Sequence, residues 1–392
     1  MYAFAPYWRH ALNFQQYPWH MLTDVCLFGD GILSGELHSN ESAMQQLSRI
    51  RYIAQRHGVR LSGSAFLSPT DLAEPTGIVQ WVSRIAGEAC RLQLDAVNVD
   101  IELPVAATNV QQRRAVTQTV AELRVALQKC RHGPMQLAFD AAWSPSGVDG
   151  RFYDLPAIAR HVDFIFVMAY DVQSQMWSQA CTAEANSPAP LVWQGLQEYR
   201  ALGIPEQQLV LGLPWYGYKY SCVNRNAVGP KSRQDADIAT HAHGRKSGGA
   251  QNELATGMST VCQIPAVKFR GAPCSDAAGA QVPYSNIMAV KRIYGAHLMW
   301  DEHAASPYMD LTGANHSKNG MHRIVFDNPE SLKRKYLIAH KMALRGVGFW
   351  HIDALDWSGC AVASRDRAAM FSAIEVFASP SETHRPLRPI EA

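Results

Sequence analysis

The sequence lacks the features that would assign it to several large functional classes. No apolar run approaches the ~18 residues that a membrane-spanning helix needs. Lysine and arginine are spread along the 392 residues and the formal net charge is +2, whereas a nucleic-acid-binding surface needs a basic patch or stripe. No Gly-x-Gly-x-x-Gly turn follows the first strand-like segment, which argues against a dinucleotide-binding sheet. We therefore expect no membrane and no nucleic acid among the partners.

The eight cysteines include no Cys-x-x-Cys pair, so neither a zinc ribbon nor a thioredoxin-like redox motif is expected. Cys26 and Cys90 lie in apolar stretches, where we expect buried free thiols. Cys222, Cys262 and Cys274 lie in a loop-rich stretch and could form a disulfide in an oxidising compartment. The residues alone leave the pairing open.

A signal peptide is not visible at the amino terminus, where Met1–Pro6 shows no basic region followed by an apolar stretch. This pattern fits either a cytosolic protein or a sequence that lacks its targeting region. Sequons at Asn40 and Asn315 are compatible with secretion. His241 and His243 alternate in a polar stretch and do not by themselves make a ligand set, so we expect no metal.

Short apolar runs recur along the chain and alternate with longer, helix-like patterns. We predict eight strands, at Tyr2–Pro6, Asp24–Phe28, Val59–Phe66, Ala96–Glu102, Met135–Ala142, Phe164–Tyr170, Leu209–Trp215 and Gly346–Ile352. The predicted helices are Glu41–His57, Gly77–Leu92, Val110–Arg131, Leu191–Leu202, Pro329–Leu344 and Val362–Phe377. Strands that alternate with helices in this way predict an α/β fold, a closed (β/α)8 barrel of the TIM type.

One long insertion, residues 219–328, interrupts the alternation between the seventh and eighth strands. Its polar part, residues 224–259, is rich in Gly, Ala, Asp and His and is expected to be flexible. We expect residues 1–378 to form one catalytic barrel. The proline-containing residues 379–392 are expected to form a mobile C-terminal tail.

The fourth predicted strand carries the chemistry. Side chains alternate faces along a strand, so Asn98, Asp100 and Glu102 share one face while the other face is apolar. Carboxyls that face a barrel interior are costly unless the site uses them. Glu102 lies nearest the carboxyl-terminal mouth, where barrel active sites lie, and is therefore the expected acid. The alternative is an exposed strand end whose acids only solvate a loop.

The same run, Asp95-Ala-Val-Asn-Val-Asp-Ile-Glu102, resembles the Asp-x-x-Asp-x-Asp-x-Glu signature of glycoside hydrolase family 18, the chitinase family. Asn98 replaces the middle Asp, which is typical of the chitobiase branch. Similar segments follow in the family's order, at Met168–Asp171, Gly212–Gly217 and Gly348–Trp350, and others resemble that branch, at Phe139–Pro145, Tyr170–Ser178, Pro214–Tyr218 and Phe269–Gly279. The resemblance extends from about Tyr2 to Phe377.

The resemblance implies a substrate-assisted, retaining mechanism, an exception to the usual scheme of two carboxylates. Glu102 would protonate the glycosidic oxygen, and the N-acetyl carbonyl of the substrate would attack the anomeric carbon. Asp100 would bind the acetamido N–H, and Tyr170 would donate its hydroxyl to the acetamido oxygen. No cofactor is implied.

Further sugar contacts follow from the same resemblance. Asp171 would line the acetamido subsite and Trp350 would form an apolar floor under the sugar. The remaining candidates are Asn98, Met168, Trp143, Tyr216, Gln173 and Arg270. Of these, Tyr216, Trp143, Gln173 and Arg270 are at least as easily explained by structural roles, and Asn98 could be an inward amide bonded to Asp100 or a neighbouring strand.

The implied substrate is an oligosaccharide that contains N-acetylglucosamine. The preferred hypothesis is cleavage of the β-1,4 bond in the N,N′-diacetylchitobiose core of free asparagine-linked oligosaccharides, which releases the reducing-end sugar. An endo-acting chitinase and a catalytically inactive chitinase-like lectin are the alternatives. The resemblance also implies a lysosomal location, and we expect a monomer.

Overall fold

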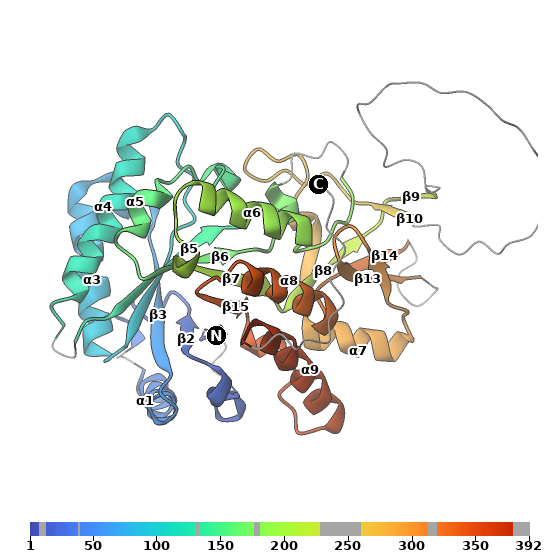
Figure 1. Cartoon of the computed structure of the whole chain (residues 1–392), viewed down its shortest axis with the longest axis horizontal. Helices are drawn as coiled ribbons and strands as arrows, with labels where there is room; N and C mark the ends of the chain where they lie inside the picture. Colours follow the sequence, from blue (N-terminus) through green and yellow to red (C-terminus); the bar gives the residue numbers. More distant parts are fainter. Residues whose placement is uncertain are drawn as a thin grey trace, which may run out of the picture.

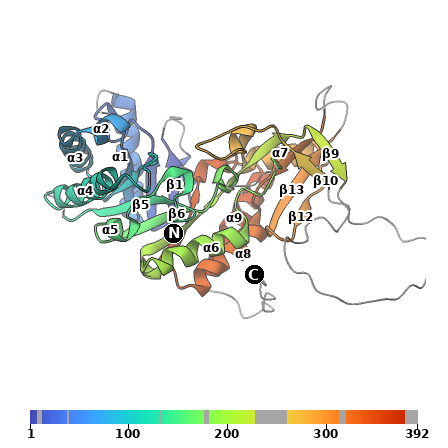
Figure 2. The same ribbon diagram turned by 90° about the horizontal axis from the view of Figure 1, so that it is seen from above.

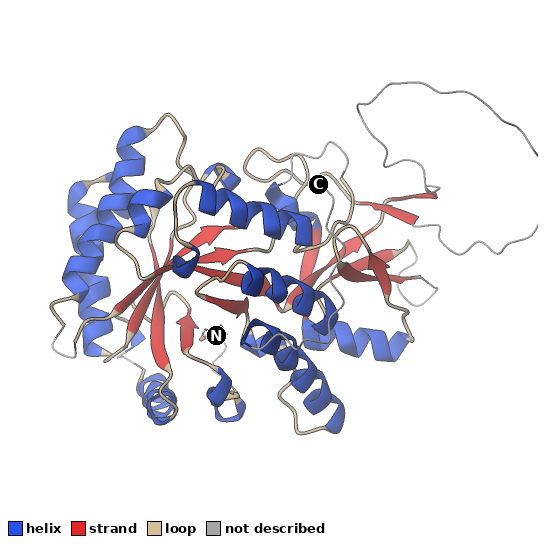
Figure 3. Cartoon of the chain, in the orientation of Figure 1, coloured by secondary structure: helices blue, strands red, loops and turns tan. Residues whose placement is uncertain are grey.

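Eight parallel strands close into a barrel in the order β1-β15-β7-β6-β5-β4-β3-β2, as the computed structural model shows (Figure 1; Figure 3). It describes residues 1–7, 13–37, 40–130, 133–175, 181–227, 260–312 and 320–378. The barrel strands are β1 Tyr2–Pro6, β2 Asp24–Phe28, β3 Arg60–Phe66, β4 Ala96–Asp100, β5 Gln136–Ala142, β6 Phe164–Met168, β7 Leu209–Pro214 and β15 Gly346–Trp350. The predicted (β/α)8 barrel is confirmed.

Helices surround the barrel. They are α1 Glu41–Arg56, α2 Pro69–Ala73, α3 Pro75–Arg91, α4 Val110–Leu127, α5 Leu155–Ala159, α6 Ala189–Ala201, α8 Pro329–Lys341 and α9 Ala361–Ala378. The short helices α2 and α5 were not predicted, because a single turn and a half cannot establish a 3.6-residue apolar period. Among the described residues, no helix is both long and apolar enough to cross a membrane.

The inside of the barrel is filled by aromatic rings. Tyr2 and Phe4 of β1 make edge-to-face contacts with each other, and Phe4 makes one with Phe166 of β6 at 4.9 Å between ring centroids. Glycines on the neighbouring strands leave room for the Phe166 ring, since a Cβ on Gly212 would lie 2.2 Å from it and one on Gly348 would lie 2.7 Å from it. The lower barrel is therefore a packed core, and space for a ligand remains only above it.

Between β7 and β15 the chain adds a five-stranded sheet of order β11-β8-β14-β13-β12. Its strands are β8 Tyr216–Ser221, β11 Gly279–Pro283, β12 Met299–Asp301, β13 Ser306–Leu311 and β14 His322–Val325, and it is accompanied by α7 Tyr284–Tyr294. A two-stranded ribbon joins β9 Asn224–Ala227 to β10 Thr260–Gln263. This added part lies at the opposite end of the long axis from α3 and α4 (Figure 1; Figure 2).

The predicted domain extent, the predicted flexible segment and the predicted C-terminal tail all remain predictions. The extent of the catalytic domain, residues 1–378, stays a prediction. Most of the segment expected to be flexible, residues 228–259, lies outside the described residues, as does the expected tail, residues 379–392. Helix α7 was not predicted, although it has 11 residues.

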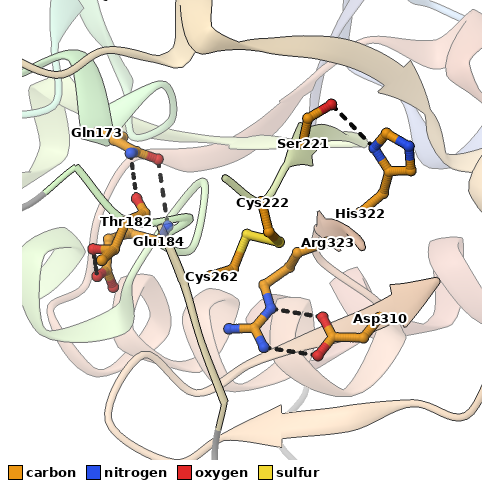
Figure 4. Close-up of a disulfide and its surroundings, with 9 residues drawn as sticks. All are labelled: Gln173, Thr182, Glu184, Ser221, Cys222, Cys262, Asp310, His322 and Arg323. Carbon is orange, nitrogen blue, oxygen red and sulfur yellow. Dashed lines mark hydrogen bonds and ion pairs between the residues drawn. A yellow bond between two sulfur atoms is a disulfide. The ribbon is translucent and has the colours of Figure 1, made fainter. Parts of the chain in front are cut away.

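Three disulfides cross-link the described part of the chain. Cys181 pairs with Cys274, and Cys222 pairs with Cys262 beside the Arg323–Asp310 ion pair (Figure 4). The third joins Cys90, at the end of α3, to Cys130, just after α4, with 5.6 Å between the Cα atoms. The expectation that Cys90 is a free thiol was wrong, because the apolar period of α3 does not show that α4 ends beside it. Cys26 is a buried free thiol, as expected.

Candidate active site

A cavity of about 360 Å³ opens at the carboxyl-terminal end of the barrel strands. It is lined by Glu102, Ala142, Asp149, Arg151, Met168, Tyr170, Asp171, Tyr218, Phe269, Asp276, Ala277, Gly279 and Gln281. These residues come from the ends of β4, β5 and β6 and from the inserted segment around β8 and β11. The insertion therefore forms one wall of the cavity, opposite the barrel loops.

Glu102 follows β4 directly, because the strand ends at Asp100 and not at Glu102 as predicted. Its side chain is 49% exposed and its Oε1 accepts a hydrogen bond from Arg151 Nη1 at 2.8 Å. The Tyr153 hydroxyl lies 3.0 Å from the carbonyl oxygen of Ile101 and 2.6 Å from that of Leu103. These bonds hold the backbone on both sides of Glu102, so a fixed loop, and not a strand residue, presents this carboxyl to the cavity.

Asp100 and Asn98 point into the barrel beneath Glu102. Asp100 is 9% exposed and Asn98 is fully buried. Burial and, second, the charge of Glu102 raise the pKa of Asp100 to about 8, while the Arg151 guanidinium opposes this rise. A carboxyl with this pKa carries a proton at neutral and acidic pH. The Asn98 Nδ2 donates to Asp140 Oδ1 of β5 at 2.8 Å.

Tyr170 and Asp171 follow β6 and line the cavity together. Tyr170 is buried, and its pKa is raised well above the ordinary value by that burial, so its hydroxyl keeps its proton and can donate. Asp171 accepts hydrogen bonds from the hydroxyls of Tyr216 and Tyr218. Burial and the nearby Asp276 raise the pKa of Asp171 to about 7, while the two tyrosine hydroxyls oppose this rise.

The other predicted sugar contacts are divided between the cavity and the surrounding core. Met168 lines the cavity, and Trp350 lies at the top of the barrel core, with ring centroids 5.4 Å from Phe4 and 4.6 Å from Phe28. Trp143 packs instead in the outer core between the barrel and its helices, where it does not line the cavity formed by the described residues.

Gln173 and Arg270 also have structural contacts. The amide of Gln173 bonds the backbone at Thr182 and Glu184 (Figure 4). Arg270 lies in a turn of the insertion, stacks over the Phe269 ring at 5.0 Å, and approaches Asp149 Oδ2 at 3.7 Å. Arg270 is thus beside the cavity without being one of its lining residues.

Several site residues were not identified in the sequence. Arg151 and Asp149 lie in the loop after β5, and their only signal is that this loop follows a strand end. Asp140 belongs to the segment Phe139–Pro145, whose resemblance to the chitobiase branch was noted, but the buried position of its carboxyl was not foreseen. Tyr218 was likewise part of a recognised segment. A period-two analysis of β5 would have placed Asp140 on the same face as Ala138, inside the barrel.

Comparisons with known proteins identify the family of the chain. The model of the family "Glycosyl hydrolases family 18" matches residues 67–354. Di-N-acetylchitobiase of Rattus norvegicus is 32% identical over 365 residues, which cover 92% of this chain and 84% of that protein. The human di-N-acetylchitobiase is 32% identical over 364 residues, which cover 93% of this chain and 81% of that protein.

Solved structures show the same fold. A group IV chitinase of Ostrinia furnacalis superposes with a TM-score of 0.70 at 16% identity, covering 97% of this chain and 99% of that one. A class V chitinase of Nicotiana tobaccum gives a TM-score of 0.67 at 17% identity, covering 96% and 98%. At these identities the likeness shows the fold alone. The family match and the relatives that align over nearly the whole chain show that it belongs to glycoside hydrolase family 18 and is a chitin-related glycosidase.

Proposed function

We propose that this enzyme cleaves the β-1,4 bond of the N,N′-diacetylchitobiose core in free asparagine-linked oligosaccharides and releases the reducing-end N-acetylglucosamine. The relatives that align over nearly the whole chain at 32% identity are di-N-acetylchitobiases. The reaction would proceed with retention, and the acetamido group of the substrate would be the nucleophile. Glu102 would be the acid and then the base for the incoming water.

The observation that carries this mechanism is the contrast between Glu102 and the other carboxyls around the cavity. Glu102 is about half exposed, so its proton can reach a bound sugar. The other cavity carboxyls also have partners, as Glu102 has in Arg151, but they are less exposed: Asp149 is bonded to Arg151, Asp171 to Tyr216 and Tyr218, and Asp276 to Tyr220. Asp100 is buried and carries a proton. None of these is placed as a free nucleophile, which favours attack by the substrate's own carbonyl.

The buried groups beneath Glu102 would serve the acetamide. Asp100 would accept the acetamido N–H as positive charge develops on the ring that forms. Tyr170 would donate its hydroxyl to the acetamido oxygen. Trp350, above the aromatic core, would support the apolar face of the same sugar, and Met168 and Asp171 would enclose it. The ion pair between Arg151 and Glu102 would open when the substrate enters, because the acid needs its proton.

The proposed location is an acidic, lysosome-like compartment. Three disulfides in the described chain fit a protein that folds in an oxidising environment. The pKa of Asp171 is raised to about 7 and that of Asp100 to about 8, so both carboxyls are neutral at acidic pH.

The direct test is product analysis with an oligosaccharide labelled at the reducing end of its chitobiose core. We expect the release of one labelled N-acetylglucosamine at mildly acidic pH. Internal cuts in chitin oligomers would instead support an endo-acting chitinase, and binding without turnover would support a lectin. Retention would be seen as the initial β anomer of the new reducing end by proton NMR.

The acid is tested with Glu102→Gln, which keeps the size of the side chain but cannot give a proton. We expect the rate to fall by at least about a hundredfold, the usual contribution of general acid catalysis. Glu122→Gln, at a half-buried position of α4 away from the cavity, is the matched control and should keep the wild-type rate. A Glu102→Gln enzyme as active as wild type would show that the acid is another residue.

A further inference from the structure

Asp140 is a buried carboxyl for which the mechanism above has no use. It lies on β5 inside the barrel and is 1% exposed. Its Oδ1 accepts a hydrogen bond from Nδ2 of Asn98 on the neighbouring strand β4. A carboxyl buried inside an aromatic-lined barrel is costly unless its bonds serve a purpose. Asp140 therefore needs a role that involves Asn98.

Two buried oxygen atoms next to this bond have no hydrogen-bond partner among the described residues: Oδ1 of Asn98 and Oδ1 of Asp100. Both residues lie on the inward face of β4, two positions apart. An amide oxygen can only accept a hydrogen bond, and a carboxyl oxygen can donate one only when it is protonated. A proton on Asp100 would satisfy both atoms at once.

We propose that Asp140 is a positioning residue that fixes the amide of Asn98, so that the Asn98 carbonyl holds the proton of Asp100 in the resting enzyme. This proposal rests on the proposed function, in which Asp100 and Glu102 act as a pair. Because Asp140 binds the N–H side of the amide, the oxygen side faces away from Asp140. Without Asp140 the amide could rotate and turn its N–H groups toward Asp100.

The electrostatics of the site agree with this arrangement. Burial raises the pKa of Asp100 to about 8, and burial raises that of Asp140 well above its ordinary value. The bond from Asn98 opposes the rise at Asp140. The other ionisable groups that face these two carboxyls are Tyr2 of β1, Cys26 of β2, Glu102 after β4, Arg151 and Tyr153 after β5, and Tyr170 after β6. Strand β3 contributes only the hydroxyls of Ser62 and Ser64.

The consequence is a place to store the proton that the reaction needs. In the resting site Glu102 accepts a hydrogen bond from Arg151. The proton shared by Asp100 and Glu102 then resides on Asp100, and it reaches Glu102 when the substrate displaces Arg151.

The alkaline limb of the rate–pH profile reports the loss of this proton. If Asn98 binds the proton of Asp100 less tightly, the alkaline limb therefore moves to lower pH.

The variants Asp140→Ala and Asp140→Leu remove the acceptor, and the second also fills the space. In either one the Asn98 amide can donate to ionised Asp100. We expect the alkaline limb of kcat/KM to move down by about one pH unit, the size of one hydrogen bond to a charged group. KM should change little. A fluorogenic glycoside of an N-acetylchitooligosaccharide provides the assay.

Asp140→Asn is the rescue variant, because its carbonyl oxygen can still accept the Asn98 N–H. Its alkaline limb should stay where the wild-type limb is. Ser62→Ala is the matched control in the same barrel interior, since the Ser62 hydroxyl bonds to Tyr2, the Val25 carbonyl and the Cys26 thiol. The proposal would be overturned if the alkaline limb stayed in place in Asp140→Ala and Asp140→Leu. It would also be overturned if the alkaline limb of Asp140→Asn moved as far as in those two variants.

A measurement on the wild-type protein without substrate covers the case in which neither apolar variant folds. The carboxyl ¹³C resonance of Asp100, assigned with Asp100→Asn, should titrate above neutral pH, and the side-chain ¹⁵N resonance of Asn98 should follow it with the same midpoint. A side-chain ¹⁵N chemical shift of Asn98 that stays constant while Asp100 titrates would refute the proposal. A wild-type enzyme without activity on chitobiose substrates would refute the proposed function and leave this titration unaffected.

Discussion

Asp100 and Glu102 are two residues apart, yet their surroundings differ in the property that decides their chemistry. Glu102 is half exposed and accepts a hydrogen bond from an arginine, whereas Asp100 lies below it and is buried. An exposed carboxyl can reach a glycosidic oxygen, and a buried one can hold a proton or an N–H. The same residue type therefore serves two roles because one lies in the strand and the other just beyond its end.

At the residue scale, Asn98→Asp tests how a negative charge beneath Asp100 and Glu102 affects the ionisation of these two carboxyls. The new carboxyl would lie against Asp140, and the two would share one proton, since both cannot be ionised at hydrogen-bond distance. The remaining negative charge raises the pKa of Asp100. The added negative charge favours every protonated form of the Asp100–Glu102 pair, so we expect both the acid limb and the alkaline limb of the rate–pH profile to move up by about one pH unit.

Asn98→Gln is the control for this variant, because it disturbs packing at the same position without adding charge. Its rate is expected to fall, but its acid limb should stay in place. An Asn98→Asp enzyme whose profile matches that of the wild type would show that the charge at this position does not reach Asp100. Full profiles on a fluorogenic substrate, with thermal unfolding as a check on the fold, provide the measurement.

At the element scale, the turn between Phe269 and Ala272 closes the cavity against the loop after β5. The two residues bond each other through their backbones, and the turn needs φ of +44° at Arg270 and +94° at Gly271. Arg270 then reaches Asp149, which is bonded to Arg151 and through it to the acid. A chain of charges thus joins the insertion to Glu102.

We expect this turn to limit the substrate to a short one. The cavity of about 360 Å³ is at the small end of the usual range for ligand sites. Arg270→Ala removes the contact with Asp149 and the ring contact with Phe269, so the wall can open. KM for a chitobiose substrate should rise by roughly three- to tenfold, the effect of one partly exposed charge contact, and longer chitin oligomers should show internal cuts.

Lys268→Ala is the matched control, because it removes the same charge from an exposed position just before the turn. It should leave KM and the products unchanged. If Arg270→Ala gave the wild-type products and KM, the wall would not depend on this contact. Chromatography of the products from labelled chitin oligomers separates terminal from internal cuts.

The sequence could predict the parts of this site that depend on residues close together in the chain, and not the parts that depend on residues far apart in it. The period-two rule predicted that Asn98, Asp100 and Glu102 face the barrel interior, with Glu102 nearest its mouth, and the resemblance added Tyr170 and Asp171. Local rules could not show that β4 ends before Glu102. Nor could they show which loop residues pair across the cavity, because such pairs depend on the twist of the barrel and on the path of the insertion.

The disulfides show the same limit at the scale of the whole molecule. Cys90 reads as a core residue of an amphipathic helix, yet it is bonded to Cys130 because α3 and α4 pack side by side. That bond lies in the outer helix layer. The bond between Cys181 and Cys274 instead connects the segment after β6 to the insertion, just beyond the turn that walls the cavity. The Cys90–Cys130 disulfide therefore cross-links the outer helices, and the Cys181–Cys274 disulfide cross-links the segments around the cavity.

These positions predict different consequences for two double variants, Cys90→Ser with Cys130→Ser and Cys181→Ser with Cys274→Ser. Each removes a cross-link, and each should lower the free energy of unfolding by about 2–4 kcal/mol. KM should rise only in the second variant, because its cavity wall, from Phe269 onward, loses an anchor while the outer helices do not touch the substrate. Thermal unfolding and KM measured on the same preparations separate the two effects. Equal changes in KM would mean that the wall is held by its charge contacts and strand pairing alone.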